Sequence, residues 1–233
     1  MVFQDPAGSL NPRMTAGAAV GEALRVHGRA KNRAEAREMA AEWLETVGLD
    51  AGYLDRYPHE MSGGQRQRVN LARALCTGAE FLVADEPVSA LDVSVQAQIL
   101  NLLKRLQRER GITWVLIGHD LAVLRQMADR VVVMYAGQCV EEAPLKELME
   151  HPAHCYTRAL MRAVPGLHDD RSRWLYSISG FVPQEYGEIQ GCRFAQRCPH
   201  GAGCPERDED RMYEIAPGHF SRCLWEGGGM RDG

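Results

Sequence analysis

The feature that most constrains the fold is a pair of short apolar runs separated by a long amphipathic segment. Residues 81–84 (Phe-Leu-Val-Ala) and 113–117 (Thr-Trp-Val-Leu-Ile) predict strands that are covered on both faces of a sheet. Between them, apolar residues recur at helical spacing at Val95, Ile99, Leu102, Leu103 and Leu106. A strand, a helix and a strand in this order predict a βαβ crossover and therefore an α/β fold.

Signals for further helices and a hairpin lie on either side of this crossover. Thr15 and Asn32 occupy positions typical of helix N-caps. The remaining predicted elements are a helix at about 64–76, a hairpin at 131–140, and short helices at about 144–150 and 154–163. Residues 164–190 predict a linker, because prolines and glycines interrupt them.

The composition excludes several classes of protein. Among the 233 residues no apolar run approaches the roughly 18 that a membrane span requires, so a globular chain is expected. The net charge of −4, with both signs interspersed, gives no reason to expect a nucleic-acid-binding patch or a polybasic membrane anchor. Seven cysteines are an odd number, which fits thiols in a reducing cytoplasm better than a disulfide scaffold.

A glycine pair marks the start of the helix expected at about 64–76. Ser62 and Gln65 have the spacing of a capping box, so an ordinary helix N-terminus is one interpretation. Gly63 and Gly64 exceed what a cap needs, and without side chains they would let backbone N–H groups approach a phosphate oxygen closely. A cap and a phosphate-binding turn both remain open from these residues alone.

Two carboxylates directly follow the first apolar run. Asp85 and Glu86 would lie at the carboxyl end of a strand, where α/β sheets bind ligands. Asp85 is a candidate ligand for Mg²⁺, and Glu86 is a candidate to orient or deprotonate a water that attacks a phosphoryl group. The alternative is a solvated turn, which explains the polarity but not two acids directly behind four apolar residues.

Three further residues complete the candidate site. His119 follows the second apolar run and could reach the edge where Asp85 and Glu86 lie, although a single histidine is more often a capping or core residue. Asp92 ends the segment Ser-Ala-Leu-Asp, which opens the helix between the two runs. Gln4 lies in an expected loop, Phe-Gln-Asp-Pro, and carries no signal by itself.

Together and in order, these segments resemble the motifs of the nucleotide-binding subunit of ABC transporters. The matching segments are the Q-loop at 3–6, the signature at 61–65, the Walker B strand at 81–86, the D-loop at 89–92 and the switch histidine His119. The signature departs from the family pattern at Met61, where leucine is usual. The resemblance covers about residues 1–163.

Within this family, the chain looks most like the ATPases of dipeptide and oligopeptide importers. Residues 9–12 (Ser-Leu-Asn-Pro) and 90–96 (Ala-Leu-Asp-Val-Ser-Val-Gln) carry this closer resemblance. The segment at 154–157 is also similar, with Cys155 in place of the usual proline, and residues 191–199 resemble the subfamily's C-terminal extension.

The resemblance implies a fold and a division of the chain. The expected fold class is α/β, with a partial P-loop NTPase domain of the ABC type at 1–163. This domain would comprise a helical subdomain at about 13–78 and a core at about 79–150. Residues 164–233 would form a small cysteine-rich C-terminal extension of the peptide-transporter type.

The resemblance also implies that two subunits close head to tail over two ATP molecules. Ser62, Gly63 and Gly64, followed by Gln65, would then contact the γ-phosphate of ATP held on the partner's P-loop. Asp92, in the D-loop, would be a further nucleotide-binding residue.

The remaining roles concern the nucleotide that a subunit holds itself. The resemblance implies that Asp85 supports Mg²⁺ and that Gln4 senses the metal and the attacking water. Glu86 would polarise that water, and His119 would contact the γ-phosphate.

The implied partners follow from the same resemblance. They are a second ABC ATPase subunit, two transmembrane permease subunits and, indirectly, an extracytoplasmic substrate-binding protein, with no nucleic acid. The implied location is peripheral, on the cytoplasmic face of the inner membrane.

One motif of the family is missing from the sequence. A P-loop reads G-x-x-x-x-G-K-[ST], and its lysine reaches the β- and γ-phosphates. The three lysines, Lys31, Lys104 and Lys146, neither follow a glycine nor precede serine or threonine. We therefore expect the N-terminal lobe to be absent, through a late start in the gene model or a real truncation, and the chain alone to have no ATPase activity.

Two alternatives to an energy-coupling importer subunit remain open. The first is a non-catalytic, truncated subunit that lends its signature motif to a partner ATPase. The second is a soluble ABC ATPase of DNA repair or translation, a class that usually carries long coiled-coil insertions or a duplicated cassette. Neither of those features is visible in the sequence.

Four cysteines near the C-terminus suggest a metal site. Cys192, Cys198, Cys204 and Cys223 could bind zinc, although structural zinc usually takes pairs only two to four residues apart. Four thiolates can also hold a [4Fe-4S] cluster, and the importer resemblance favours that cluster over zinc or unligated thiols. His200 and His219 are possible substitute ligands, but solvated surface histidines are the expected interpretation. Because residues 191–233 have few aliphatic side chains, we expect a cross-link rather than an apolar core to order them.

Overall fold

The computed structural model describes residues 1–164, 176–185, 189, 191–201 and 211–223. The chain divides into two compact units, residues 1–127 and 128–233. The predicted domain boundary between residues 163 and 164 is a different one. It rests on sequence resemblance rather than on compactness, and it stays a prediction.

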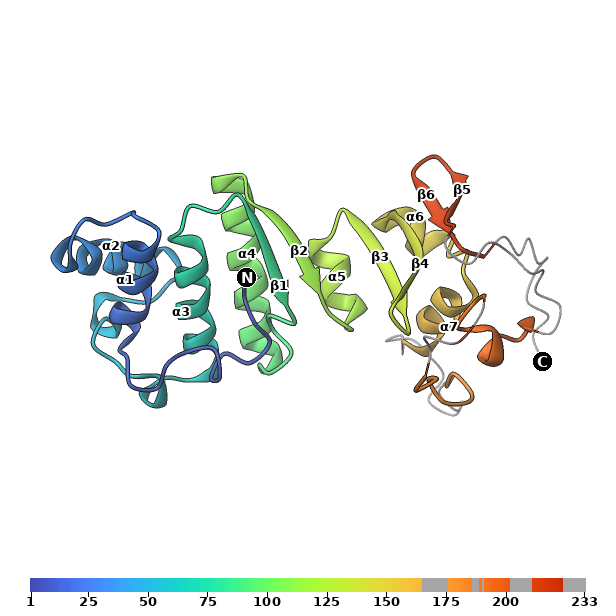
Figure 1. Cartoon of the computed structure of the whole chain (residues 1–233), viewed down its shortest axis with the longest axis horizontal. Helices are drawn as coiled ribbons and strands as arrows, with labels where there is room; N and C mark the ends of the chain where they lie inside the picture. The colour runs from blue at the N-terminus through green and yellow to red at the C-terminus, as the bar shows by residue number, and fades with distance from the viewer. Residues whose placement is uncertain (165–175, 186–188, 190, 202–210, 224–233) are drawn as a thin grey trace. The chain divides into compact units, whose positions relative to one another are not determined.

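Helices dominate the start of the first unit. They are α1 (Ala16–Val26), α2 (Arg33–Thr46) and α3 (Gly63–Leu75), with short 3-10 turns at Ala51–Tyr53 and Pro58–Glu60. The predicted caps are confirmed: Thr15 accepts the N–H of Ala18 (3.3 Å), and Asn32 accepts the N–H of Glu35 (2.9 Å). Helices α1 and α2 pack against each other, and each also packs against α3 (Figure 1).

The predicted βαβ crossover is confirmed in the same unit. It consists of β1 (Phe81–Asp85), α4 (Val93–Arg110) and β2 (Thr113–Ile117), and α5 (Leu121–Met127) follows. The two strands pair in parallel, with Asp85 opposite Ile117 at their carboxyl ends. On the other edge of β1, Val2 forms a parallel bridge to Ala84, which places the start of the chain beside this strand.

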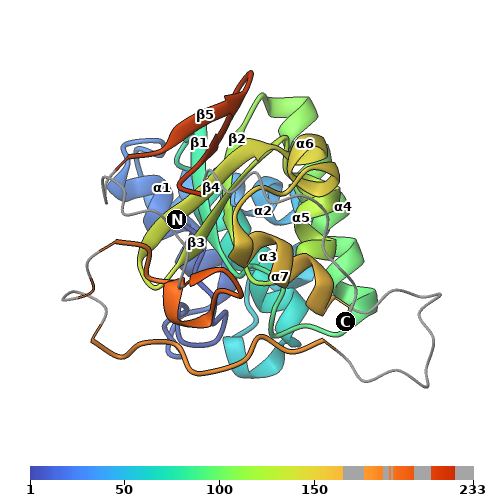
Figure 2. The same cartoon turned by 90° about the vertical axis from the view of Figure 1, so that its right-hand side faces the viewer.

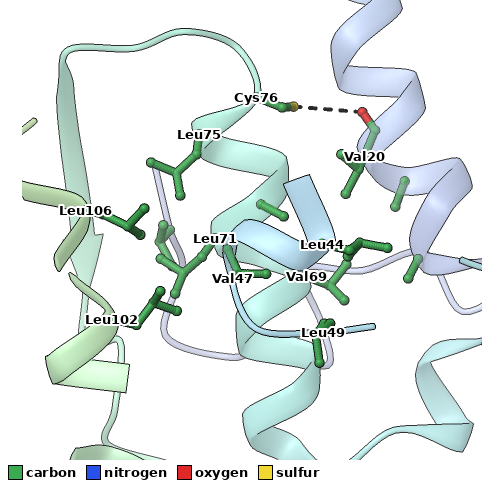
Figure 3. Packing of buried hydrophobic residues seen from close by; sticks show 14 of the residues in the cluster. Val20, Leu44, Val47, Leu49, Val69, Leu71, Leu75, Cys76, Leu102 and Leu106 are labelled. Carbon is green, nitrogen blue, oxygen red and sulfur yellow. Dashed lines mark hydrogen bonds between the residues drawn. The ribbon is translucent and has the colours of Figure 1, made fainter. Parts of the chain in front are cut away.

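The apolar core of the first unit lies around α3. Val69 and Leu71 of this helix are completely buried, and Leu106 of α4 is buried with them (Figure 3). Leu82 and Ala84 of β1 belong to the same core. Because α3 carries both the signature motif at its start and core residues along its length, apolar packing fixes the position of that motif.

The second unit is built on an antiparallel sheet. Its elements are β3 (Arg130–Tyr135), β4 (Gln138–Pro144), α6 (Leu145–Glu150), α7 (Cys155–Ala163), a 3-10 turn (Ala195–Arg197), β5 (Tyr213–Ala216) and β6 (His219–Ser221). The strand order is β3-β4-β6-β5, so the predicted hairpin at 131–140 is confirmed and extended by two strands. Figure 2 shows α6 and α7, which follow the hairpin in sequence.

The cysteine-rich segment has more apolar packing than the sequence suggests. Phe194 is only 1% exposed, and its ring lies 5.2 Å from that of Tyr135 and 5.4 Å from that of Tyr156. Apolar packing therefore contributes to the order of the described part of residues 191–233, and the expected cross-link stays a prediction. Aromatic contacts and strand pairing replace the aliphatic side chains that this segment lacks.

Candidate functional site

The backbone around β1 brings Gln4 to the candidate site. Val2 donates its N–H to the carbonyl of Val83 (2.8 Å) and accepts the N–H of Asp85 (2.9 Å). These two bonds align the first residues with β1, so Gln4 is delivered to the carboxyl end of that strand. Gln4 gave no signal by itself, and its position becomes clear only from the strand pairing.

Glu86 lies at the centre of three predicted catalytic residues. Gln4 Nε2 donates to Glu86 Oε2 (2.9 Å), and His119 Nδ1 donates to Glu86 Oε1 (2.9 Å). Glu86 has a φ of 42°, which is rare for a residue other than glycine. Its N–H donates to the carbonyl of Ile117 (2.9 Å), so the end of β2 holds this unusual backbone conformation in place.

The hydrogen bonds around Glu86 set its charge. They lower the pKa of its carboxyl group below the ordinary value; the bond from His119 is the largest cause, and Ser89 and Gln4 add to it. Glu86 is therefore a carboxylate at neutral pH and can accept a proton or a hydrogen bond from water. Asp85, the last residue of β1, is half-buried beside this group.

The signature residues form a second group at the start of α3. Ser62 Oγ accepts the N–H of Gln65 (3.4 Å), and Gln65 Oε1 accepts the N–H of Ser62 (2.9 Å), which confirms the capping box. A Cβ atom at Gly64 would lie only 2.4 Å from Val95 Cγ1. The close packing of α3 against the start of α4 is thus a sufficient structural reason for glycine at this position.

Asp92 also has a structural role. Its carboxylate caps α4 by accepting the N–H of Val95 (3.0 Å). Gly64 packs closely against Val95, the residue whose N–H Asp92 binds, so Asp92 lies next to the signature residues. The structure thus brings Gln4, Glu86 and His119 together, and it places Asp92 beside the signature.

Sequence reasoning missed the polar residues on the buried side of α3. Asn70 Nδ2 donates to the carbonyl of Pro6 (3.2 Å) and to Ser9 Oγ (2.8 Å), and Arg73 donates to the carbonyl of Ser9 (2.7 Å). These bonds attach the loop after Gln4 to α3. The available signal was an amide among the apolar residues of an amphipathic helix, because a buried amide needs a partner.

The predicted cysteine ligands fall only partly within the described residues. Cys192 Sγ lies 3.7 Å from His154 Nε2, Cys198 and Cys223 both hydrogen-bond to Cys155, and Cys204 lies outside the described residues. Over the described ranges, no group of three or more metal-ligating side chains is arranged to hold a metal ion. The [4Fe-4S] and zinc predictions therefore gain no support from this part of the chain.

The thiols of Cys155 and Cys198 nevertheless differ in acidity. The hydrogen bond from Cys155 lowers the pKa of Cys198 to about 6, whereas the same contacts and burial raise the pKa of Cys155. Cys155, which stands in place of the subfamily's usual proline, thus contacts two of the predicted ligands.

His219 also differs from its expected surface position. It is 1% exposed, and its Nε2 donates to Glu141 Oε1 (2.8 Å), a carboxylate that is completely buried. The expectation of a solvated histidine is wrong because a buried carboxylate needs hydrogen-bond donors, and His219 is one of them.

Comparison with protein families agrees with the motifs. The model of the ABC transporter family matches residues 1–89, and that of the oligopeptide/dipeptide transporter C-terminal region matches residues 140–204. Two relatives from Bacillus subtilis (strain 168) are the oligopeptide transport ATP-binding protein OppF, 45% identical over 223 residues, and the putative oligopeptide transport ATP-binding protein YkfD, 46% identical over 229. Each alignment covers 96% of this chain and 68% of the relative.

This chain belongs to the ABC transporter ATP-binding family. A putative peptide import ATP-binding protein of Brucella ovis is also 44% identical, over 96% of this chain and 70% of its own length. The resemblance in the sequence is thereby confirmed, including the oligopeptide/dipeptide C-terminal region.

Solved structures confirm the ABC ATPase fold. The dimeric structure of MJ0796, a bacterial ABC transporter cassette, is 36% identical with a TM-score of 0.55, and its post-hydrolysis state with ADP and Pi is 34% identical with a TM-score of 0.54. The chain spans 61% of the length of these two solved chains, and 62% of its own residues are covered. Among the helices of the described ranges, none combines the length and the apolar character that crossing a membrane requires.

Proposed function

We propose that this chain is part of the energy-coupling ATPase subunit of an importer for dipeptides or oligopeptides. The observation that carries the proposal is the placement of Glu86 between Gln4 and His119 at the carboxyl ends of β1 and β2. An ionised carboxylate with two donors at this edge of an α/β sheet suits a site for nucleotide hydrolysis.

In the proposed reaction, water attacks the γ-phosphate of ATP in line with the leaving oxygen. Glu86 would orient that water and accept its proton, while His119 would donate to the γ-phosphate. Asp85 and Gln4 offer the oxygen donors that Mg²⁺ prefers, so they would hold the ion. When bound, Mg²⁺ would neutralise the charge that develops on the transferred phosphoryl group.

The signature group would act on a different nucleotide. Ser62, Gly63, Gly64 and Gln65 begin α3, whose N-terminal end favours an anion, and would contact ATP held by a second ATPase subunit. The loop after Gln4 would contact a transmembrane permease subunit. Closure of the two ATPase subunits over ATP would then drive the permease from the cytoplasmic side of the membrane, with a substrate-binding protein delivering peptides from the other side.

For the 233-residue polypeptide itself, we propose that the signature group is the active part. The experiment mixes the purified chain with an intact oligopeptide-transport ATPase subunit whose own signature serine is replaced by arginine. ATP turnover should appear only in the mixture, because this chain then supplies the working signature to the intact subunit's P-loop. Replacing Ser62→Arg should remove that turnover, whereas Ser177→Arg, an exposed position of the second unit, should preserve most of it.

Two outcomes would contradict this proposal. The first is an inactive mixture even though the two subunits associate. The second is turnover by the chain alone that Glu86→Gln abolishes, because it would show a complete nucleotide site in a chain for which we expect none.

As a second proposal, the C-terminal cysteines hold a metal centre, with [4Fe-4S] preferred over zinc. Its support is the resemblance of residues 191–199 to the C-terminal extension of peptide-importer ATPases, together with the four cysteines of residues 191–233. Cys192 and Cys204 would complete the ligand set and so cross-link the extension.

Metal analysis tests this second proposal directly. Anaerobically purified protein should contain about four iron and four sulfide per chain, and Cys198→Ser should reduce both. Zinc without iron would replace the cluster with a zinc site, and the absence of both metals would refute the proposal.

A further inference from the structure

The loop between β1 and α4, residues 86–92, is held from two sides by glutamine side chains. Gln67 of α3 donates through Nε2 to the carbonyl of Pro87 (2.8 Å). Gln96 of α4 donates through Nε2 to the carbonyls of Val88 (3.0 Å) and Leu91 (3.2 Å). Three carbonyls of one short loop are therefore bound by two amides from the helices on either side of it.

The burial of Gln67 makes its contact informative. Its side chain is completely buried, its Nε2 is bonded to Pro87, and its Oε1 has no hydrogen-bond partner within the described residues. An unpartnered buried oxygen costs free energy, so an apolar residue would serve a purely structural position at least as well. The hydrogen bond to the carbonyl of Pro87 is therefore the interaction that requires an amide at this position.

The same loop connects the two groups of site residues. It begins at Glu86, whose φ of 42° requires a restrained backbone, and it ends at Asp92, which caps α4. Gly63 and Gly64 pack closely on the loop's second half and on α4, since Cβ atoms there would approach Leu91 (3.3 Å) and Val95 (2.4 Å). Any movement of the loop would therefore displace the signature and the D-loop relative to each other.

We propose that Gln67 and Gln96 are positioning residues that lock the signature motif and loop 86–92 into one rigid surface for a partner's ATP. This inference rests on the proposed function, because it concerns the surface that the chain presents to a second subunit. The amides would act through the backbone of the loop and would not touch the nucleotide. Their loss should reduce the rate of hydrolysis more than the affinity for ATP, since the partner's P-loop holds the nucleotide.

The test uses the mixed ATPase assay with three methionine variants of the full chain. Gln67→Met and Gln96→Met remove the amides at similar volume, and Gln98→Met is the matched control, because Gln98 lies on α4 and binds Arg68 instead of the loop. We expect kcat to fall by about tenfold or more for the first two variants, with KM for ATP unchanged within about twofold. The control should behave as the unchanged chain does.

Hydrogen exchange separates this inference from the proposed function. Amides of residues 86–92 should exchange about tenfold faster in Gln67→Met and Gln96→Met, while those of α1 and α2 keep their rates.

If the unchanged chain gives no turnover in the mixture, the proposed function fails, and loop exchange alone then decides the role of the glutamines. If Gln67→Met does not fold, the half-buried Gln96 carries the test. Unchanged loop exchange in Gln96→Met, or a kcat equal to that of Gln98→Met, would overturn the inference.

Discussion

The two compact units bury polar groups in different ways. In the first unit, neutral amides on helices bind loop carbonyls, as Gln67 binds Pro87 and Asn70 binds Pro6. In the second unit, the central buried polar group is a carboxylate, Glu141. The difference matters because an amide loses little when it is buried with a partner, whereas a carboxylate must keep several donors to remain charged in the interior.

Glu141 joins three segments of the second unit. It lies on β4 and accepts the N–H of Ala153 (2.7 Å), the N–H of His154 (2.9 Å) and Nε2 of His219 (2.8 Å). His154 caps α7 by accepting the N–H of Tyr156 (3.1 Å), and burial lowers the pKa of its ring to about 4, so it stays neutral. Within the described residues, the second unit is therefore organised around the buried carboxyl group of Glu141, whereas the first unit has a larger apolar core.

The largest expected effect comes from removing the Glu141 carboxyl group and its three hydrogen bonds. Glu141→Ala should destabilise the second unit by about 3–5 kcal/mol, because the N–H groups of Ala153 and His154 and the buried ring Nε2 of His219 lose their acceptor. Urea unfolding followed by hydrogen exchange in each unit measures the change. Glu141→Gln, which keeps one acceptor oxygen, should cost less. An equal loss of protection from hydrogen exchange in both units would show that Glu141 does not stabilise the second unit specifically.

The matching change in the first unit is made in its apolar core. Leu71→Ala should cost about 3 kcal/mol, because Leu71 is completely buried and its truncation leaves a cavity in the core. The same exchange experiment should place the loss in the first unit. Val26→Ala is the control, since Val26 is 77% exposed, and it should change stability by less than about 0.5 kcal/mol. A cost for Leu71→Ala as small as that of the control would refute the apolar account of this unit.

A smaller effect concerns alkaline pH and the first unit. Burial raises the pKa of the Cys76 thiol to about 11 from 9.0, and the thiol lies 3.8 Å from the carbonyl of Val20 (Figure 3). A raised thiol pKa means that the folded state holds the proton more tightly. Its contribution to stability is therefore complete below pH 9 and is lost as the pH rises towards 11.

Comparison with a variant isolates this contribution. Between pH 9 and 11 the unchanged chain should lose about 1 kcal/mol more stability than Cys76→Ala, after allowance for solvent screening. Urea midpoints measured across that range provide the value. Parallel pH curves for the two proteins would show that Cys76 is not buried as described.

The smallest effect is expected at an exposed ion pair. Arg37 donates to both carboxylate oxygens of Asp55 (2.9 and 2.7 Å), and both side chains are more than half exposed. Arg37→Ala should leave the urea midpoint unchanged, because solvent and salt screen exposed charges. A clear decrease in the urea midpoint of Arg37→Ala that disappears at high salt would show that surface charge, as well as the apolar core, stabilises the first unit.

Local sequence patterns predicted the elements that depend on near neighbours. The caps at Thr15 and Asn32, the βαβ crossover and the hairpin at 131–140 all follow from spacing within a few residues. The meeting of Glu86 and His119 also followed from sequence, because the carboxyl ends of adjacent parallel strands lie at one edge.

Contacts between distant segments could not be predicted in this way. A single buried histidine has no periodic signal, so His219 looked like a surface residue until its pairing with Glu141 was known. Gln67 and Gln96 resembled ordinary polar positions on helices, because their partners are backbone carbonyls that carry no sequence signature. The positive φ of Glu86 depends on the loop around it and has no signal in the residue type.

The pairing of β6 with β4 has a consequence for synthesis of the protein on the ribosome. Glu141 and His219 are 78 positions apart, so the second unit cannot complete its sheet until its last strand has left the exit tunnel. The first unit ends at residue 127, so its own internal contacts can form while translation of the rest continues. During that interval the β3–β4 hairpin is exposed with an unpaired edge, and this is the stage at which the nascent chain is most prone to aggregate or to need a chaperone.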